Sequence, residues 1–464
     1  YGGGTYRLYI DGIEVDSAAG TNPSTNNFEC IMGAMDQSAG GGNPDPLNYF
    51  SGWLDELRIW NIALTEEQIH HMMNQEVMDN GGNVRGAIVP IDIPGLTWSN
   101  LDGYYQMNQS SDIANGYLLR NAGTTDGLLR KIVTWQDETA PLPYTSIRNG
   151  NWNTVNSGAT PWTHGDTVWD YPNSTGVNGA DIDWNIVVTN HNITSNAQDV
   201  TLLGLLVESN ELTITNSGTQ DETNTGTGLW VTHYLKLDGV LDLIGESQLV
   251  QKRYTPTQVN GSVLDITSSG YLERDQQGTT NLYNYNYWSS PVGPIGAGSN
   301  NTDYTVGGCM MDGTNSSSPG NITWITNSYN ASGSVPIGLS NRWIYSYINR
   351  PSENYYNWEF KGNAAAIPVG LGYTMKGSGI SGSYQNYVYK GKPNNATIIS
   401  PVGIGNQALV GNPYPSSIDA NEFIIDNGPA GTNSIDGSLY FWEHYISNAT
   451  HITELYEGGY ATYN

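Results

Sequence analysis

Charged residues are scarce in this chain, and most of those present are acidic. They make up 13% of the 464 residues, against roughly a quarter in ordinary globular proteins. The formal net charge is −27 and only 17 residues are Lys or Arg. Phosphate groups are bound by clustered basic side chains, so we expect no nucleic-acid partner.

Cysteine is also scarce, and long apolar runs are missing. The two cysteines, Cys30 and Cys309, exclude a disulfide framework, and we expect two separate buried thiols. No run of about 18 apolar residues occurs, so the sequence predicts no transmembrane helix. The chain opens within a predicted strand, without Met or a signal peptide, and we interpret it as an internal fragment of a longer precursor.

Phenylalanine is the scarcest aromatic residue, at 5, against 31 Tyr and 14 Trp. A dry interior accepts Phe, whereas rings that carry a hydrogen-bonding group suit exposed polar sites, where sugar rings can stack. Tyr283, Tyr285 and Tyr287 alternate along one predicted strand and therefore share a face. They are our candidate ligand-binding residues, with an aromatic ladder that stabilises the sheet as the alternative.

Glycine is abundant, at 56 residues, and short apolar runs alternate with polar turns. This pattern predicts an all-β, multidomain protein. The predicted parts are a half jelly roll (1–79), an extension with a Pro/Asn/Gly-rich linker of little regular structure (80–180), a β-solenoid-like segment (181–270) and an antiparallel β-sandwich (271–464).

The N-terminal part carries strong local signals. Asp11-Gly12 between alternating apolar residues predicts a hairpin with a type I′ turn. Residues 53–60, "WLDELRIW", predict a strand. Thr65 followed by Gln68 is a capping box, so we expect a helix at about 66–74.

This order of elements resembles the C-terminal half of a laminin-G-like, concanavalin-type jelly roll. The residues that carry the resemblance are Tyr49, Phe50, Gly52, Asp55, Glu56, Arg58, Ile59, Trp60, Leu64 and Ile69. Such sandwiches often bind Ca²⁺ through Asp and backbone oxygens, so the resemblance implies Asp55 and Asp11 as candidate metal ligands. The alternative for Asp55 is a hydrogen bond to neighbouring backbone.

The solenoid prediction depends on apolar residues that recur along short strands. Leu235, Leu237, Leu241, Leu243 and Leu249 follow steps of two and six residues, which is typical of stacked parallel coils. An antiparallel meander is the alternative. In the predicted sandwich, the segments "NYWSSPV" and "LVGNPYPSSI" look like counterparts in a weak internal repeat.

The phrases "YLERDQQGTTNLYNYNYWSSPVG", "YQNYVYKGKPNN", "LVGNPYPSSIDANEFI" and "LYFWEHY" carry a second resemblance. They resemble large secreted surface proteins of Bacteroidota, especially flavobacteria, that use type IX secretion. Some of these are gliding-motility adhesins. The resemblance implies an extracellular or cell-surface location, glycans or surface proteins as partners and, by analogy, the type IX secretion machinery.

No motif predicts catalysis. Asp55 and Glu56, as neighbours on a strand, should face opposite ways and so not cooperate in glycoside hydrolysis. His70 and His71 lack an HExxH pattern and should face solvent. We therefore expect a non-enzymatic adhesin. The alternatives are a carbohydrate-binding region of a secreted polysaccharide-handling enzyme and a structural component of a surface filament or secretion complex.

Overall fold

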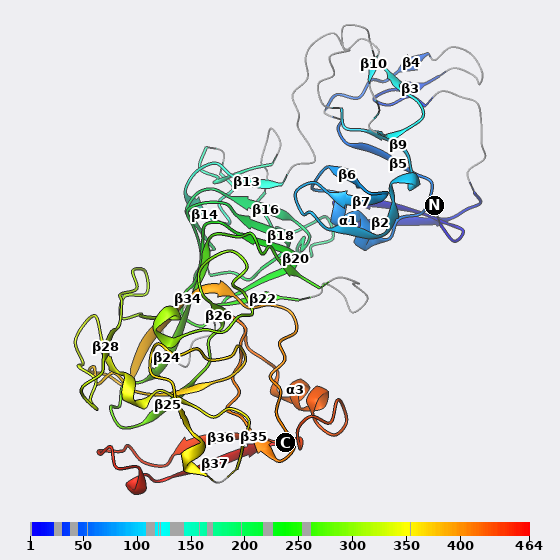
Figure 1. Ribbon diagram of the computed structural model, residues 1–464. Coiled ribbons are helices and arrows are strands. Elements are labelled where there is room, and N and C mark those ends of the chain that lie inside the picture. Colours follow the sequence, from blue (N-terminus) through cyan, green and yellow to red (C-terminus); the bar gives the residue numbers. More distant parts are fainter. Residues whose placement is uncertain are drawn as a thin grey trace. The chain divides into compact units, whose positions relative to one another are not determined.

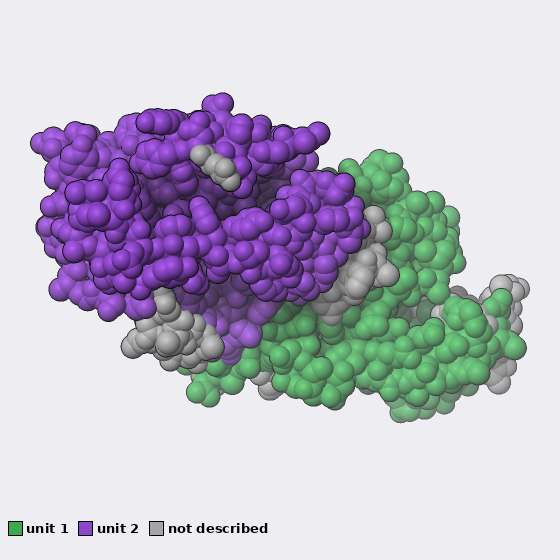
Figure 2. Space-filling view, turned by 90° about the horizontal axis from the view of Figure 1, so that it is seen from below, with its two compact units in different colours: residues 1–147, 153–188, 201–204 green, residues 148–152, 189–200, 205–464 purple. Residues whose placement is uncertain are grey.

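The computed structural model describes residues 2–22, 30–37, 45–52, 54–107, 117–118, 120, 122–129, 143–156, 158–164, 170–195, 197–216, 226–252, 261–352 and 354–464. Strands hold 39% of the chain and helices 8%, so the predicted all-β class is confirmed. The chain forms two compact units, coloured separately in Figure 2. Unit 1 comprises residues 1–147, 153–188 and 201–204, and unit 2 comprises 148–152, 189–200 and 205–464.

Unit 1 begins with the predicted hairpin. Strands β1 (Thr5–Ile10) and β2 (Ile13–Ala19) pair antiparallel across Asp11-Gly12. Both turn residues have positive φ, 53° and 81°, as a type I′ turn requires. The hairpin prediction is therefore confirmed.

Helix α1 (Glu66–Met72) also forms as predicted, with its C-cap at Met73. Thr65 Oγ1 accepts a hydrogen bond from Gln68 N (3.2 Å), and Gln68 Oε1 accepts one from Thr65 N (2.9 Å). Met72 packs into a core with residues from the sheet β6 (Val77–Asn80), β7 (Asn83–Gly86) and β8 (Asp92–Thr97). The helix thereby buries its apolar face against this sheet.

The strand predicted at 53–60 is shorter in the structure. It runs as β5 (Leu57–Trp60) and pairs antiparallel with β9 (Leu101–Tyr105), which in turn pairs with β11 (Ala122–Gly123). Trp53 lies outside the described residues. Glu56 has a φ of 50°, and this left-handed residue ends the extended backbone on the N-terminal side of β5.

The segment predicted as a linker contributes strands. In unit 1, β13 (Tyr144–Ser146) pairs with β15 (Trp162–Thr163) and with β16 (Ile186–Thr189). Trp162 is 1% exposed. The expectation of little regular structure here is wrong for these residues, because short strands gain stability from partners distant in sequence.

Unit 2 contains a parallel ladder, green in Figure 1. Its strands pair in the order β14 (Gly150–Asn151), β17 (Ile193–Thr194), β19 (Glu211–Ile214), β21 (Val240–Leu243) and β24 (Tyr271–Thr279), each parallel to the next. A second parallel set joins β20 (Gly228–Leu237) to β22 (Gln248–Gln251) and β23 (Val263–Leu264). These strands pair parallel, as in the predicted solenoid, whereas a meander would pair them antiparallel. The five leucines on which the solenoid prediction depends are all buried.

The same sheet continues into antiparallel strands. β24 pairs along eight residues with β34 (Tyr384–Pro393), whose other pairings are with β26 (Val292–Gly293) and β27 (Met310–Asp312). A second layer, β25 (Tyr285–Trp288) with β33 (Tyr373–Lys376), packs on it. Trp288 of β25 meets Tyr387 of β34 edge-on, with ring centroids 5.5 Å apart.

Shorter elements complete the two units. In unit 2 these are the strand pairs β28 (Thr323–Ile325) with β29 (Gly338–Ser340), β30 (Tyr345–Ser346) with β32 (Glu359–Phe360), β31 (Arg350–Pro351) with β35 (Asn406–Gln407) and β36 (Leu439–His444) with β37 (Gly458–Tyr463), and the helices α2 (Val306–Cys309), α3 (Ala420–Asn427), η3 (Asn341–Trp343), η4 (Tyr355–Asn357) and η5 (Thr453–Leu455). In unit 1 they are β3 (Met35–Asp36) with β4 (Pro46–Leu47), β10 (Tyr117–Leu118) with β12 (Gly127–Leu128), and η1 (Trp98–Asn100). Strand β18 (Val200–Val207) spans the division between the units.

Tyrosine serves the core as well as the surface, which corrects the expectation that its excess marks an exposed site. Tyr373 and Tyr389 are fully buried, and their hydroxyl oxygens lie 2.9 Å apart. Buried Tyr304 donates to Leu371 O (2.7 Å). A buried hydroxyl is tolerated when it is hydrogen-bonded, so these interior sites accept Tyr where Phe was expected.

The thiols are separate, as predicted, but only one of them is buried. Cys309 is buried and burial raises its pKa to about 12, whereas Cys30 is exposed. The described residues contain no helix that is long and apolar enough to span a membrane.

Candidate functional site

The best candidate site is a hollow of about 600 Å³ within unit 2. It lies where β24, β25 and β34 meet the segment 409–417, and we call it the ring-and-amide hollow. Its lining includes Glu246, Gln248, Arg274, Gln276, Gln277, Asn286, Tyr287, Trp288, Ser289, Tyr389, Gly411, Asn412, Tyr414 and Ser417. Aromatic rings and side-chain amides therefore make up most of these lining side chains.

The two segments that resemble each other in sequence form much of this wall. "NYWSSPV" contributes Asn286 to Ser289, and "LVGNPYPSSI" contributes Leu409 to Asn412 and Tyr414. They touch directly, since a Cβ added to Gly411 would lie 2.3 Å from the Ser289 Cβ. The glycine therefore permits this close approach.

Hydrogen bonds fix the segment 409–417 in place. Ser417 N donates to Gln248 Oε1 (2.9 Å) and Leu249 N donates to Pro415 O (3.0 Å). Tyr414 N donates to Asn412 Oδ1 (3.0 Å), and its hydroxyl donates to Ala396 O (2.7 Å). The wall is thus held by backbone and side-chain bonds before any ligand arrives.

Charge in the hollow is limited. Glu246 is the one described lining residue with a carboxylate, and Arg274 is the one with a cationic group. Arg274 Nη1 donates to the backbone oxygens of Ser247 (2.9 Å) and Asp275 (3.1 Å). Glycoside hydrolysis normally needs two cooperating carboxylates, which these lining residues do not supply.

The three predicted tyrosines are divided between two places. Tyr287 is 39% exposed and lines the hollow. Tyr285 instead meets Trp343 edge-on at 6.2 Å, and Tyr283, which precedes β25, lies 4.7 Å from the ring of His451. Of the three, only Tyr287 belongs to the candidate site.

Tyr285 belongs to an aromatic cage around Lys376, which is 3% exposed. The Lys376 Nζ lies 3.5 Å from the ring centroid of Trp343, 4.7 Å from that of Tyr285 and 5.1 Å from that of Tyr456. It also donates to the Tyr456 hydroxyl (2.6 Å). Burial lowers the pKa of Lys376 to about 7. Sequence reasoning did not single out this lysine, since its cage comes from segments far apart in the chain.

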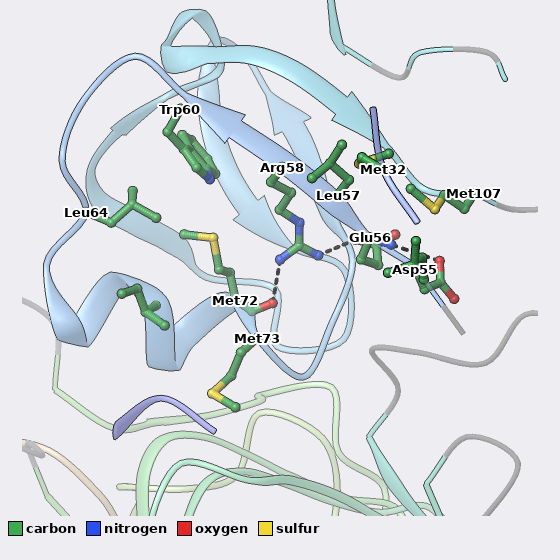
Figure 3. Close-up of a pocket in the computed structure, with 12 residues that line it drawn as sticks. Met32, Asp55, Glu56, Leu57, Arg58, Trp60, Leu64, Met72, Met73 and Met107 are labelled. Carbon is green, nitrogen blue, oxygen red and sulfur yellow. Dashed lines mark hydrogen bonds and ion pairs between the residues drawn. The ribbon is translucent and has the colours of Figure 1, made fainter. Parts of the chain in front are cut away.

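Unit 1 has a hollow of its own, of about 400 Å³, shown in Figure 3. Its lining is mostly apolar and includes Met32, Met72, Met73 and Met107. The buried Arg58 binds Glu56 and donates to Met72 O (2.7 Å).

Glu56 is held inside this network rather than presented to a substrate. Burial raises the pKa of Glu56, while Arg58 and the Tyr104 hydroxyl, which donates to it (2.7 Å), oppose that rise. Asp55 Oδ1 accepts from Glu56 N (2.9 Å). Glu56 is therefore used structurally, and this bond is of the kind stated above as the alternative for Asp55, whose metal-ligand role stays a prediction.

The two candidate metal ligands lie at different places in unit 1. Asp11 occupies the hairpin turn, and its backbone oxygen accepts from Trp184 Nε1 (3.1 Å). Asp55 lies beside the hollow of Figure 3. Within the described ranges, no three His, Cys, Asp or Glu side chains gather as a metal site. A calcium shell at either Asp would have to draw on backbone and amide oxygens.

His70 and His71 correct a prediction, because both are buried at 4% and 1% exposure. His70 Nε2 lies 2.8 Å from Gly12 O, and its ring stacks on Trp184 with centroids 3.7 Å apart. Burial lowers the pKa of His70. His70 therefore joins helix α1 to the β1–β2 turn.

Comparison with known families matches both ends of the chain. Residues 1–70 match the Concanavalin A-like lectin/glucanases superfamily, so the laminin-G-like resemblance is confirmed there. No curated protein and no solved structure matches the chain. Residues 162–464 match a second family model, which covers well over half of the sequence. The chain therefore belongs to the family described as Domain of unknown function (DUF8693).

Proposed function

We propose that this protein is a non-catalytic, saccharide-binding protein of the bacterial cell surface, and that the ring-and-amide hollow holds the sugar. The observation that carries the proposal is the lining of that hollow. It combines a partly exposed ring, Tyr287, with Gln276, Asn286 and Asn412 and a single carboxylate. Rings accept the apolar face of a sugar, and amides bind its hydroxyl groups in both directions.

We propose binding without catalysis because of where the carboxylates of the two hollows lie and what they bind. Glu246 is the one carboxylate among the described residues that line the hollow, and Glu56 is tied to Arg58 and Tyr104. A retaining or inverting glycosidase needs a pair at roughly 5–9.5 Å. Binding without turnover is therefore the better-supported function.

The location and role are part of the same proposal. The segment at 1–70 matches a superfamily of lectins and glucanases, and the sequence resembles type IX secretion substrates, some of which are adhesins. We propose an adhesin on that basis, exported by type IX secretion. The superfamily description also favours a second candidate, the carbohydrate-binding region of a polysaccharide-handling enzyme.

Calcium is proposed as a cofactor of the concanavalin-like segment only, with Asp55 and Asp11 as candidate ligands at separate places and Asp55 as the one tested first. Titration of the intact chain with Ca²⁺, followed by calorimetry, tests this directly. A heat of binding that is lost in the Asp55→Asn variant supports it, whereas no heat at millimolar Ca²⁺ contradicts it.

Binding of the intact chain to an immobilised glycan array tests the main proposal. We expect Tyr287→Ala to weaken binding about tenfold, the scale of one lost ring contact. Tyr356→Ala is the matched control, because Tyr356 is 91% exposed and is not among the residues that line the hollow. Absence of binding to every glycan, or equal loss in both variants, would contradict a saccharide site here.

A further inference from the structure

Arg274 carries the one cationic group among the described residues that line the ring-and-amide hollow, and no described carboxylate forms an ion pair with it. The buried Arg58 of unit 1, by contrast, is paired with Glu56. Burial lowers the pKa of Arg274, and Glu246 and Asp275 oppose this only in part. A cation withdrawn from water is costly unless an anion is paired with it, so a ligand with a negative group would complete this site.

Backbone carbonyl groups hold one side of the Arg274 guanidinium. Its Nη1 donates to Ser247 O (2.9 Å) and to Asp275 O (3.1 Å). The turn before Ser247 is itself fixed, because Gly245 N donates to Asp275 Oδ2 (2.8 Å). The guanidinium is therefore in place before a ligand arrives, and little side-chain freedom is lost on binding.

The other side of the Arg274 guanidinium is open. Its Nε and Nη2 have no hydrogen-bond partner among the described residues, and neither belongs to the unpartnered polar atoms of these residues that are sealed from solvent. Nε–H and one Nη2–H form a planar fork of two parallel donors, which fits two oxygens of a carboxylate. A sulfate group also offers such a pair of oxygens. A hydroxyl group offers one oxygen and no charge.

Gln276 lies beside this fork on the same face of β24, because side chains two residues apart on a strand share a face, about 6.6 Å apart. In the register of β24 with β34, Tyr389 lies opposite Arg274, so this is also the face on which Trp288 packs. The Gln276 amide lines the hollow and has no hydrogen-bond partner among the described residues. It can therefore donate to and accept from hydroxyl groups of a sugar whose acidic group meets Arg274.

Glu246 limits how much negative charge the hollow accepts. It is the one anionic group among the described lining residues, and the whole chain carries a net charge of −27. A densely charged polyanion would be repelled at long range. A sugar with one acidic group can place that group at Arg274 and turn hydroxyl groups, which donate, toward Glu246.

We infer that the hollow takes a saccharide with a single acidic group, whose carboxylate or sulfate oxygens accept from Arg274 Nε and Nη2 while Gln276 binds neighbouring hydroxyl groups. Arg274 is thereby the specificity-determining residue of the site. This inference rests on the proposed function and adds the ligand class and the residue that selects it.

Calorimetry on the intact chain tests the inference with pairs of ligands that differ in charge. Short oligosaccharides with one glucuronate or galacturonate residue are compared with their methyl esters, and monosulfated galacto-oligosaccharides with their unsulfated forms. We expect the acidic member of at least one pair to bind about ten- to hundredfold more tightly, as hydrogen bonds to a charged group would. Preference for the uronates assigns the acidic group to a carboxylate, and preference for the sulfated sugars assigns it to a sulfate.

Arg274→Lys keeps the positive charge but removes the planar fork, so it should weaken binding of the acidic sugar about tenfold. Arg342→Lys is the matched control and should leave the affinity unchanged. Arg342 is also half-buried and has no ion pair among the described residues, but it does not line the hollow. Should Arg274→Lys fold poorly, Gln276→Ala replaces it and should weaken binding of the acidic sugar about fivefold.

The outcomes separate the two proposals. Equal binding of the acidic and neutral members of every pair overturns this inference and leaves saccharide binding in place. Acid-selective binding that Arg274→Lys leaves unchanged does the same, as does acid-selective binding that Gln276→Ala leaves unchanged where the lysine variant does not fold. Failure of every ligand, acidic and neutral, overturns the proposed function as well.

Discussion

Raising the pH from about 7 to 9 should stabilise unit 2 through Lys376. Burial lowers the pKa of this ammonium from 10.5 to about 7, and no carboxylate pairs with it among the described residues. In the unfolded chain the lysine keeps its ordinary pKa. Between these two values the unfolded state holds a proton that the folded state has released, so stability rises with pH.

The size of this change in stability depends on the burial of Lys376 and on its aromatic cage. Each pKa unit corresponds to about 1.4 kcal/mol, so burial alone would give about 2 kcal/mol between pH 7 and 9. The rings of Trp343, Tyr285 and Tyr456 favour the charged form, by about 1 kcal/mol for a partly desolvated cation. Residual solvent screening reduces the effect further, which leaves about 1–2 kcal/mol.

Urea unfolding of the native protein and of Lys376→Met at several pH values isolates this contribution. Met keeps the apolar stem in contact with the rings but cannot titrate. The free energy of unfolding of the native protein, minus that of Lys376→Met, should rise by about 1–2 kcal/mol from pH 7 to 9. Subtraction removes the general alkaline destabilisation of an acidic chain. A flat or falling difference would refute the argument.

Three further predictions concern single residues. Thr65→Ala should lower the free energy of unfolding of unit 1 by about 1 kcal/mol, because the N-cap bond is lost, as urea denaturation would measure. Tyr104→Phe should cost about 1–3 kcal/mol in the same assay, since buried Glu56 loses a donor at 2.7 Å; a cost no larger than that of an exposed Tyr→Phe change would contradict it. A thiol reagent at neutral pH should label exposed Cys30 in the native protein, and Cys309, whose pKa is about 12, only in denaturant. Mass spectrometry reads the two sites separately, and labelling of both at equal rates would contradict the burial of Cys309.

The sequence predicted the features that neighbouring residues determine. The Asp11-Gly12 turn and the Thr65–Gln68 capping box depend on atoms within four residues of each other. The alternating leucines of 235–249 predicted buried strands, because strand periodicity is read directly from sequence. The sequence left open whether these strands form a solenoid or a meander. The structure shows parallel pairing, which favours the solenoid and cannot be read from local sequence.

Predictions failed where burial depends on distant segments. His70 is covered by Trp184, more than a hundred residues away in sequence, so its helix position alone suggested exposure. Glu56 adopts a positive φ instead of extending β5, and its side chain meets Arg58 and Tyr104. A strand-based argument about opposite faces therefore did not apply to Asp55 and Glu56.

The sequence indicated only part of the candidate site, because the site also depends on a contact between distant segments. Tyr287 and the paired segments "NYWSSPV" and "LVGNPYPSSI" drew attention as an aromatic strand and a weak repeat, yet nothing local indicated that these segments meet. Their contact forms the hollow, and a contact between residues 289 and 411 is a property of the fold.

Every described residue that lines the ring-and-amide hollow falls within 162–464, the region that defines the family. The hollow of Figure 3 has a different origin, since most of its lining falls within the concanavalin-like segment at 1–70. Saccharide binding that depends on Tyr287 would therefore be a property of the DUF8693 part of the chain. Binding that survives Tyr287→Ala but fails on removal of calcium would instead assign recognition to the concanavalin-like segment. The same measurements therefore test whether the DUF8693 region and the concanavalin-like segment have separate roles.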